Sequence, residues 1–510
     1  MIPGSDVVDL SRLQFGLTAL YHFLFVPLTL GLSLILAIME TVYVMTGHQI
    51  WYRMVKYWGV LFGINFVLGV ATGLTMEFQF GTNWAYYSHY VGDVFGAPLA
   101  IEGLMAFFLE ATFVGLFFFG WERLTKFQHM CCTWLLALGA NLSALWILIA
   151  NGWMQNPVGA KFDFHTMRME VTDFYKVFFN PVAQAKFVHT ISAGYVTGAI
   201  FVLSISSYFL LRKRNLDFAK RSMAVAVSFG LAASLSVVVL GDESGYLANS
   251  DQKMKVAVIE SMWHTEKAPA NLTLFGWPNE KLQRTDYAVD IPYLLGIIAT
   301  RSFSEPILGI TELIEQGKQK IRTGILAYDA LVRLQKNPND LIAKISFEKY
   351  QDVLGYGLLL KKYTEKVIDA SESQITQAAN DLKPKVVPLF VSFHVMVACG
   401  LFFILLFAVG NYLLVKRKIH NTRWYLYLAF LSLPLPWVAA ELGWVVAEYG
   451  RQPWVVQGIL PTFIATSTLT IAQISTSLFS FVAFYSILAV IEIYLMVKYI
   501  RIGPEGIIEG

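Results

Sequence analysis

The sequence has little charge and very few cysteines. Only 15% of its 510 residues are charged, against about 25% in an average soluble protein. The cysteines, Cys131, Cys132 and Cys399, form neither C-x-x-C nor C-x-x-C-H. This spacing argues against a disulfide framework, an iron–sulfur centre and covalently attached c-type haem. No convincing glycine-rich nucleotide loop is present either, since Gly355-x-Gly357 lies in a polar region.

Long apolar runs dominate what remains, and 56% of the residues are hydrophobic. Runs longer than about 18 residues are typical of helices that cross a membrane. The predicted fold is therefore an all-α integral membrane protein with about nine transmembrane helices. We expect spans at 15–45, 56–80, 96–121, 130–152, 184–211, 219–241, 387–415, 424–447 and 472–499. The first run is too long for a signal-peptide core and lacks a basic leader, so we expect it to be retained.

The short loops predict the orientation of these spans. Lys and Arg are concentrated after spans 1, 3, 5 and 7 and at the C-terminus, whereas residues 82–95 contain none. By the positive-inside rule, the N-terminus is expected outside and the C-terminus in the cytoplasm.

That orientation places residues 242–386 outside the membrane. We expect three parts: residues 1–241 with helices 1–6, an extracytoplasmic segment at 242–386, and residues 387–510 with helices 7–9 and a short tail. Within the middle part, two amphipathic helices are predicted near 308–336 and 340–362.

Several spans carry ionisable or metal-ligating side chains near their outer ends. These residues are His22, Glu102, His189, Met396 and Glu448. Glu110 lies about 12 Å further along the span of Glu102. In the segment ELGWVVAEYGRQPW at 441–454, Glu441, Trp444 and Glu448 share one helical face. Ionisable residues are costly inside a membrane and point by default to a functional site.

In haem proteins, a His and a Met from different helices can serve as the axial ligands of a low-spin haem that transfers electrons. Carboxylates beside such a haem could act as ligands of further metal centres or as proton carriers. Individually, these residues have simpler explanations, because a lone Met usually fills a core and a lone His usually bonds a neighbouring helix. Their common depth favours the functional interpretation.

Other polar residues are expected to be peripheral. Lys253 and Lys255 are predicted to be solvated, and His129 is expected at the surface with the other loop histidines. Glu40 lies near a span end, where it either faces lipid head groups or serves a site.

Long motifs resemble subunit I of the cytochrome bd quinol oxidases. They are YHFLF (21–25), GINFVLGVATGLTMEFQFGTNW (63–84), LSALWILIANGWMQNP (142–157), KFVHT (186–190), GDESGY (241–246) and GRQPW (450–454). The resemblance covers residues 9–503, and the long segment 242–386 resembles the quinol loop of the long-loop branch.

The resemblance implies an electrogenic, copper-free quinol:oxygen oxidoreductase with a low-spin haem b, a high-spin haem b and a haem d. His189 and Met396 would ligate the low-spin haem iron, and His22 one of the two high-spin irons. Glu102 and Glu448 would be ligands or close partners of that pair. Further roles would fall to Glu110 in proton transfer or a propionate network, to Lys255 and Glu260 in quinol oxidation, and to Arg451 and Trp444 near the haems.

One position departs from the family pattern, because His394 stands where relatives often carry Arg. This histidine is a rival of Met396 as a ligand, although the two side chains point about 200° apart on a helix.

The resemblance further implies a bacterial inner-membrane location, with quinol oxidised at the outer face and cytoplasmic protons used to reduce oxygen. A second large subunit, small single-helix subunits and lipids are the expected partners, without nucleic acid. Two alternatives stay open: a cyanide-insensitive relative with haem b only, and a haem-free transporter.

Overall fold

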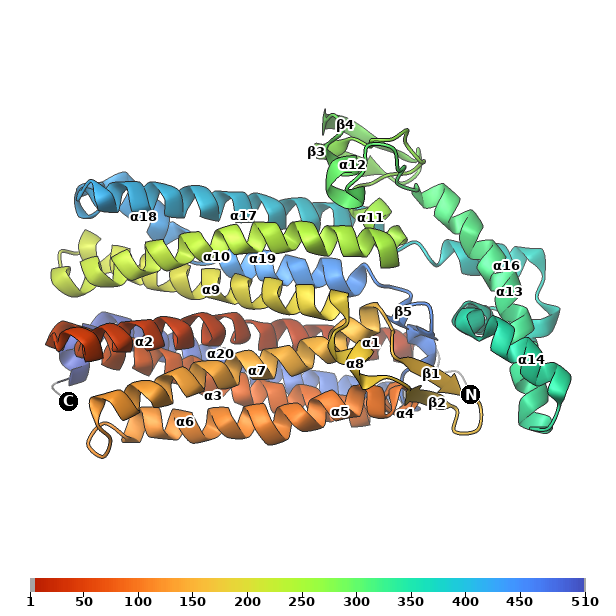
Figure 1. Cartoon of the computed structure of the whole chain (residues 1–510), viewed down its shortest axis with the longest axis horizontal. Helices are drawn as coiled ribbons and strands as arrows, with labels where there is room; N and C mark the ends of the chain where they lie inside the picture. The colour runs from red at the N-terminus through yellow and green to blue at the C-terminus, as the bar shows by residue number, and fades with distance from the viewer. Residues whose placement is uncertain (1–4, 509–510) are drawn as a thin grey trace.

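In a computed structural model, which describes residues 5–508, the chain forms a bundle of long helices with a smaller unit at one end (Figure 1). We call this end of the bundle the loop end. Within residues 5–508, nine segments are long and apolar enough to cross a membrane. They are Asp6–Thr46, Gln49–Thr82, Asp93–Phe119, Lys126–Gln155, Phe174–Leu211, Leu216–Asp251, Val386–Val415, Arg423–Tyr449 and Ile471–Gly506. The predicted number and order of spans are confirmed.

The bundle consists of regular helices joined by a few irregular turns. Its elements are α1 (Ser5–Phe23), α2 (Val26–Thr46), α3 (Gln49–Thr82), α5 (Asp93–Ile101), η1 (Glu102–Phe107), α6 (Phe108–Phe119), α7 (Lys126–Gln155), α9 (Pro181–Leu211), α10 (Leu216–Asp251), α17 (Val386–Val415), α18 (Arg423–Leu431), α19 (Leu435–Trp444), η6 (Val445–Tyr449) and α20 (Ile471–Ile508). Short elements at the loop end are α4 (Ala85–Val91), β1 (Ala160–Asp163), β2 (Arg168–Val171), α8 (Phe174–Phe178), β5 (Trp454–Val456), β6 (Leu460–Pro461) and η7 (Thr462–Ile464). A 3-10 turn, η5 (Ile419–Asn421), precedes α18.

Three predicted spans are interrupted rather than continuous. The first breaks between α1 and α2, where Pro27 lies in the first turn of α2, a position at which proline needs no hydrogen-bond partner. The third and eighth spans each contain a π-helical turn, η1 and η6. Such turns occur often at functional sites. The turn η1 begins at Glu102, and η6 contains Glu448.

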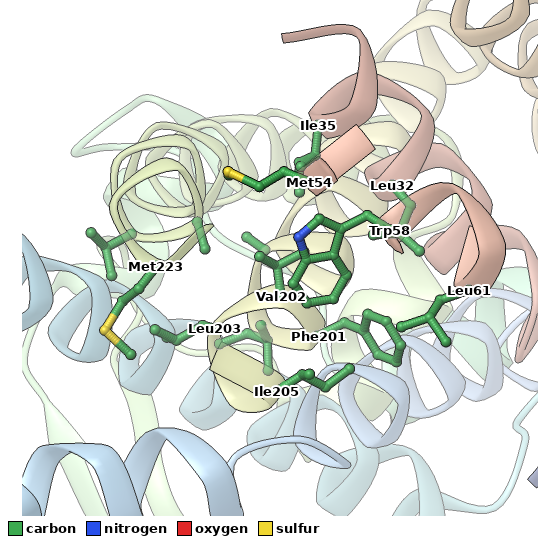
Figure 2. Packing of buried hydrophobic residues seen from close by; sticks show 14 of the residues in the cluster. Leu32, Ile35, Met54, Trp58, Leu61, Phe201, Val202, Leu203, Ile205 and Met223 are labelled. Carbon is green, nitrogen blue, oxygen red and sulfur yellow. The ribbon is translucent and has the colours of Figure 1, made fainter. Parts of the chain in front are cut away.

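The main core lies between α2, α3, α9 and α10. Figure 2 shows Trp58 of α3 among apolar side chains that include Leu32 of α2 and Phe201 of α9. The indole nitrogen of Trp58 donates to Ser222 Oγ of α10 at 3.1 Å, which satisfies the one polar atom of this buried ring. Helices α2 and α9 cross closely, because a Cβ on Gly31 would collide with the backbone at Gly198.

The unit at the loop end comprises α11 (Lys253–Ile259), β3 (Leu272–Asn279), β4 (Arg284–Ile291), α12 (Leu294–Thr300), α13 (Ile310–Lys336), α14 (Leu341–Tyr350), η2 (Gln351–Val353), α15 (Leu354–Leu358), η3 (Leu359–Lys362), η4 (Val367–Asp369) and α16 (Glu372–Asn380). Strands β3 and β4 form an antiparallel hairpin. The predicted helix at 308–336 is confirmed as α13, whereas the one at 340–362 is divided among four short elements. The division of the chain at 241/242 stays a prediction, and α10 runs unbroken across it.

Candidate functional site

A cavity of about 910 Å³ lies within the bundle, and its lining includes residues of α1, α2, α3, α5, η1, α6, α7, α19 and η6. Six of the predicted site residues line it: His22, Glu102, Glu110, Trp444, Glu448 and Arg451. The structure therefore brings together residues from three separate spans, with Arg451 directly after the last of them. The remaining predicted residues, His189, His394, Met396, Lys255 and Glu260, lie outside the lining.

His22 lies near the end of α1, one residue before the helix stops. Its Nδ1 is 2.8 Å from Oγ1 of Thr72, and the Thr72 hydroxyl donates to Leu68 O at 2.8 Å. Since the threonine proton is used on the carbonyl, its oxygen accepts from Nδ1–H of His22. This tautomer leaves Nε2 with a free lone pair, as a metal-ligating histidine requires.

Two carboxylates enter the cavity from the third span. Glu102 begins the π-helical turn η1 and accepts from Ser143 Oγ at 2.7 Å. Glu110 is buried at the start of α6 and packs against Gly139 of α7, where a Cβ would lie 3.1 Å from the Glu110 backbone nitrogen. Both carboxylates belong to helices that pack against α7.

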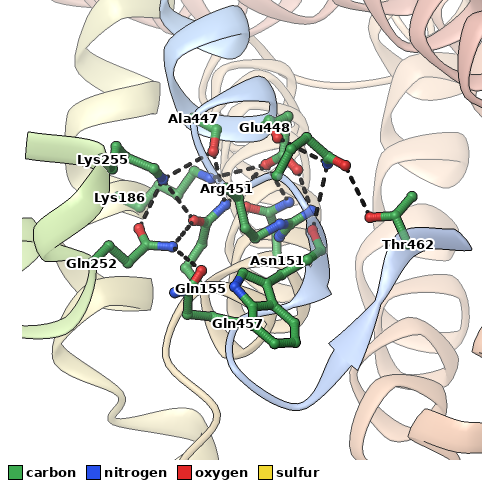
Figure 3. A network of polar contacts seen from close by, with 12 residues as sticks. Asn151, Gln155, Lys186, Gln252, Lys255, Ala447, Glu448, Arg451, Gln457 and Thr462 are labelled. Atoms are coloured by element: carbon green, nitrogen blue, oxygen red, sulfur yellow. Dashed lines mark hydrogen bonds and ion pairs between the residues drawn. The ribbon is translucent and has the colours of Figure 1, made fainter. Parts of the chain in front are cut away.

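Glu448 lies at the centre of a polar network on the loop side of the cavity (Figure 3). Its Oε1 accepts from Asn151 Nδ2 and from Gln155 Nε2, each at 3.1 Å. It pairs with Arg451 and lies 3.6 Å from Lys186 Nζ. Both amide donors come from α7, so this helix fixes the carboxylate that η6 presents.

Two cations of this network, Lys186 and Arg451, differ in how fully their nitrogens are used. Lys186 hydrogen-bonds Asn151 and lies 4.8 Å above the ring of Trp444. Arg451 is only 5% exposed, and within residues 5–508 no partner meets its Nε or Nη1. A buried guanidinium with unpaired N–H groups beside a cavity is suited to bind an anion.

Lys255 is buried, so the prediction that it is solvated was wrong. Its ammonium donates to Gln155 Oε1 at 2.9 Å, Gln252 Oε1 at 2.7 Å and Ala447 O at 2.9 Å. These three acceptors use all of its N–H groups. Burial, together with the charges of Lys186 and Arg451, lowers the pKa of Lys255 well below its ordinary value. Lys253, two residues earlier, is exposed as expected.

Glu260 follows α11 and is 5% exposed. Burial raises the pKa of its carboxyl group to about 8. Among the described residues, none hydrogen-bonds its Oε2. This carboxyl group therefore combines an unused acceptor with a pKa close to neutrality.

His189 and Met396 lie on α9 and α17, which both pack against α10. Each side chain faces a glycine: a Cβ on Gly241 would lie 3.4 Å from His189 Cε1, and one on Gly443 would lie 3.2 Å from Met396 Sδ. Nδ1 of His189 is buried and has no partner within residues 5–508.

His394 is engaged on both sides of its ring. Nδ1 lies 2.8 Å from Phe390 O and Nε2 lies 2.7 Å from Thr273 O. Carbonyl oxygens only accept, so in this arrangement neither ring nitrogen presents a free lone pair to a metal.

The structure also corrects the expectations for Glu40 and His129. Both are buried, and His129 Nδ1 lies 2.5 Å from Glu40 Oε1. Thr133 donates to the other carboxylate oxygen, and His129 Nε2 lies 2.9 Å from Phe117 O. The pair is thus a helix–helix contact between α2 and α7, and neither residue faces head groups or solvent.

Sequence reasoning missed Asn151, Gln155, Lys186 and Gln252. A usable signal exists for three of them. Lys186 is one helical turn before His189, and Asn151 and Gln155 are four apart on one face of α7. Glu441, in contrast, keeps both carboxyl oxygens buried and unpartnered within the described part of the chain.

The fold and its buried, charged cavity define a polytopic membrane protein with a large chamber among its helices. The family model for cytochrome bd terminal oxidase subunit I matches residues 10–504, and the chain belongs to this family. It is 51% identical over 501 residues to cytochrome bd-II ubiquinol oxidase subunit 1 of Escherichia coli (strain K12), covering 98% of each chain.

Two further relatives agree with this assignment. Cytochrome bd ubiquinol oxidase subunit 1 of Bacillus subtilis (strain 168) is 35% identical over 497 residues, which are 97% of this chain and 94% of the relative. The solved bd oxidase from Geobacillus thermodenitrificans has the same fold, with a TM-score of 0.78 at 24% identity and coverage of 98% and 99% of the two chains.

Proposed function

We propose that this chain is the haem-carrying subunit of a respiratory terminal oxidase that oxidises quinol and reduces oxygen to water. The observation that carries the proposal is the cavity lined by His22, with its free Nε2, together with Glu102, Glu110, Glu448 and Arg451. Its volume lies near the upper end of the range of about 300–1,000 Å³ found for cofactor and ligand sites. When bound, the haems would supply electron transfer from quinol and the reduction of oxygen.

In this proposal the cavity would hold the high-spin haem pair. His22 would ligate one iron through its free Nε2, and Glu102 and Glu448 would be ligands or close partners. Trp444 lines the same cavity. The donor set suits both haem b and haem d, because the two accept the same protein ligands. Haem d in the oxygen site is our proposal, and a haem-b-only enzyme is the alternative.

The polar network supplies the charge that haem propionates need. Lys186, Lys255 and Arg451 surround the single carboxylate Glu448, which leaves an excess of positive charge when all are ionised. Buried charges are costly unless they are paired. Anionic groups of the cofactor would balance this excess, with Arg451 offering its unpaired nitrogens. Glu110, deeper in the bundle, would carry protons toward the cavity.

We propose that His189 and Met396 would hold the iron of the low-spin haem b. A His/Met pair is suited to electron transfer. His394 is disfavoured as the rival ligand, since both of its ring nitrogens contact carbonyl oxygens.

Quinol oxidation is assigned to the loop end. Glu260 accepts a quinol proton, for which a pKa of about 8 and an unpaired oxygen are suitable. Lys255 already has three acceptors, so we infer that it acts by holding Gln155 and Ala447 in place rather than by direct contact with quinol.

We further propose that the loop end faces the periplasm of a bacterial inner membrane, as the positive-inside rule predicts. Quinol protons would be released there, and protons for water would enter from the cytoplasm, which generates a proton-motive force without a pump. Small single-helix subunits and lipids are proposed to accompany subunit II.

A reduced-minus-oxidised optical spectrum, combined with pigment extraction from the purified complex, tests this proposal. We expect bands of haem b and haem d. If only haem b is extracted, the proposal changes to the haem-b-only enzyme. A preparation of folded protein without haem would overturn the proposal. Membrane-impermeant labelling of Lys253 from one side of sealed vesicles tests the orientation separately.

A further inference from the structure

The hairpin β3–β4 exposes an apolar face that nothing in the described chain covers. It consists of Phe275, Trp277, Tyr287, Val289 and Ile291, which we call the hairpin face. Tyr287 is 86% exposed and Phe275 is 67% exposed. Large aromatic side chains in such positions require an explanation, because contiguous exposed apolar patches usually mark an interaction site.

The exposed apolar residues come from both strands of the hairpin. Val289 pairs with Phe275 and Ile291 pairs with Leu272 across the ladder, whereas Trp277 pairs with Asp286. The register shifts between Thr273 and Phe275 and between Phe275 and Trp277, and Tyr287 has a left-handed backbone with a φ of 57°. These irregularities interrupt the strict alternation of the strands, and the five residues share their exposure to the outside of the chain.

A contact at the base of the hairpin fixes its depth along the bundle. The carbonyl oxygen of Thr273 in β3 lies 2.7 Å from Nε2 of His394 in α17. His394 is eight residues past the start of α17 at Val386, or about 12 Å along its axis. Val391 and Val395, on either side of it, are exposed apolar residues of this spanning helix.

A second anchor ties the other end of the hairpin unit to α10. Arg301, directly after α12, pairs with Asp242 at 2.7 Å and with Glu243 at 3.1 Å. Both carboxylates belong to α10 and follow the exposed Val239 by three and four residues. The anchors therefore lie where the exposed apolar surface of the spanning helices gives way to charge. In Figure 1, β3, β4 and α12 lie beside the loop ends of α10 and α17.

We propose that the hairpin face binds the bilayer, with its side chains in the interfacial region of the leaflet on the loop side. Trp and Tyr are enriched at that depth because their rings are apolar and their polar atoms reach water. Strand β3 also packs against α17, on which Val391 and Val395 are exposed. A two-stranded hairpin is only marginally stable alone, and contact with lipid supplies the apolar partner that its outer face lacks.

Helix α14 provides a matched control within the same unit. Leu341, Ile342 and Ile345 form an equally exposed apolar patch, and Ile342 is 72% exposed. Figure 1 places α14 well beyond the ends of the spanning helices. Its patch is therefore expected to face water, although its exposure resembles that of the hairpin face.

The test uses the assembled oxidase in nanodiscs of phosphatidylcholine and phosphatidylglycerol. A spin label is attached at Y287C or at I342C, after Cys131, Cys132 and Cys399 are replaced by alanine. Collision of the label with oxygen, which concentrates in lipid, is compared with collision with a water-soluble nickel chelate. We expect the ratio of oxygen to nickel collisions to be higher at position 287 than at position 342.

Two outcomes would overturn the proposal. Equal nickel accessibility at both positions would place the hairpin face in water. An immobilised label at position 287 that neither reagent reaches would mean that another protein chain covers it. If the cysteine-free background does not assemble, a benzophenone amino acid at position 287 in the native background serves instead. Light-induced adducts with lipid support the proposal, and adducts with protein only, or with neither, overturn it.

Discussion

The ammonium nitrogen of Lys255 lies 2.9 Å from Oε1 of Gln155. Through its Nε2, the same glutamine donates to Glu448 at 3.1 Å. One neutral side chain of α7 thus joins a cation of the loop-end unit to a carboxylate at the cavity. Changes at either end of this bridge are expected to affect the other.

Replacing Gln155 with leucine removes both contacts while keeping the side chain's approximate volume. Unpaired buried partners of charged groups cost about 1–3 kcal/mol, and about 1.4 kcal/mol corresponds to a factor of ten in rate. We therefore expect kcat/KM for quinol to fall by about tenfold, with a shifted high-spin haem spectrum. Q457L is the control, since Gln457 only accepts a 3.3 Å bond from Gln252. Wild-type kinetics and spectra in Q155L would contradict the bridge.

The tautomer of His22 depends on Thr72. The variant T72V lacks the oxygen that accepts from Nδ1, so the ring is free to rotate or to protonate Nε2 instead. We expect partial loss of one high-spin haem, seen in its absorption band, while the low-spin haem keeps its signal. T72S retains the acceptor and should restore the wild-type spectrum. Identical haem content in T72V and the wild type would remove Thr72 from this role.

Met396 and His394 can be distinguished as ligands of the low-spin haem. M396L should abolish or shift the low-spin haem band in the reduced-minus-oxidised spectrum, because leucine has no donor atom. H394A should keep that band, since His394 is bound to Phe390 O and Thr273 O. The reverse pattern would make His394 the ligand. H394A should also loosen the hairpin β3–β4, which is measurable by hydrogen exchange at residues 272–291.

The raised pKa of Glu260 predicts how stability and quinol oxidation depend on pH. Its pKa is raised from 4.5 to about 8 in the folded protein, so ionisation opposes folding. The stability that this group contributes is complete below about pH 4.5 and is lost as the pH rises through about 8. E260Q should flatten that decline in a thermal-denaturation series across pH. The proposed base function also predicts that the rise in quinol oxidation towards pH 8 is absent in E260Q. A wild-type pH profile in the variant would exclude Glu260 as the base.

The sequence was sufficient for the spans and for a few polar residues of the cavity lining, but insufficient for the network around Glu448. Apolar length defines a span wherever its neighbours lie, and a carboxylate such as Glu102 stands out in an apolar run. Gln155 and Asn151 are uncharged and common, so their importance appears only when α7 and η6 are brought together. The burial of Lys255 depends on Gln252 and on the carbonyl of Ala447, a partner that no side-chain pattern reveals.

The Glu40–His129 pair extends this point to stability and yields the last prediction. His129 Nδ1 and Glu40 Oε1 are 2.5 Å apart, and both side chains are buried. Removing one partner of a buried ion pair leaves the other uncompensated and typically costs about 3–5 kcal/mol, whereas removing both is much less damaging. We expect E40L and H129L each to lower the temperature of thermal inactivation of the detergent-solubilised complex, and the double variant E40L/H129L to recover part of the loss. The haem spectrum of each folded variant should remain that of the wild type, because neither residue lines the cavity. Additive losses in the double variant would show that the two residues act independently, and an altered haem spectrum would assign the pair to the cofactor site instead.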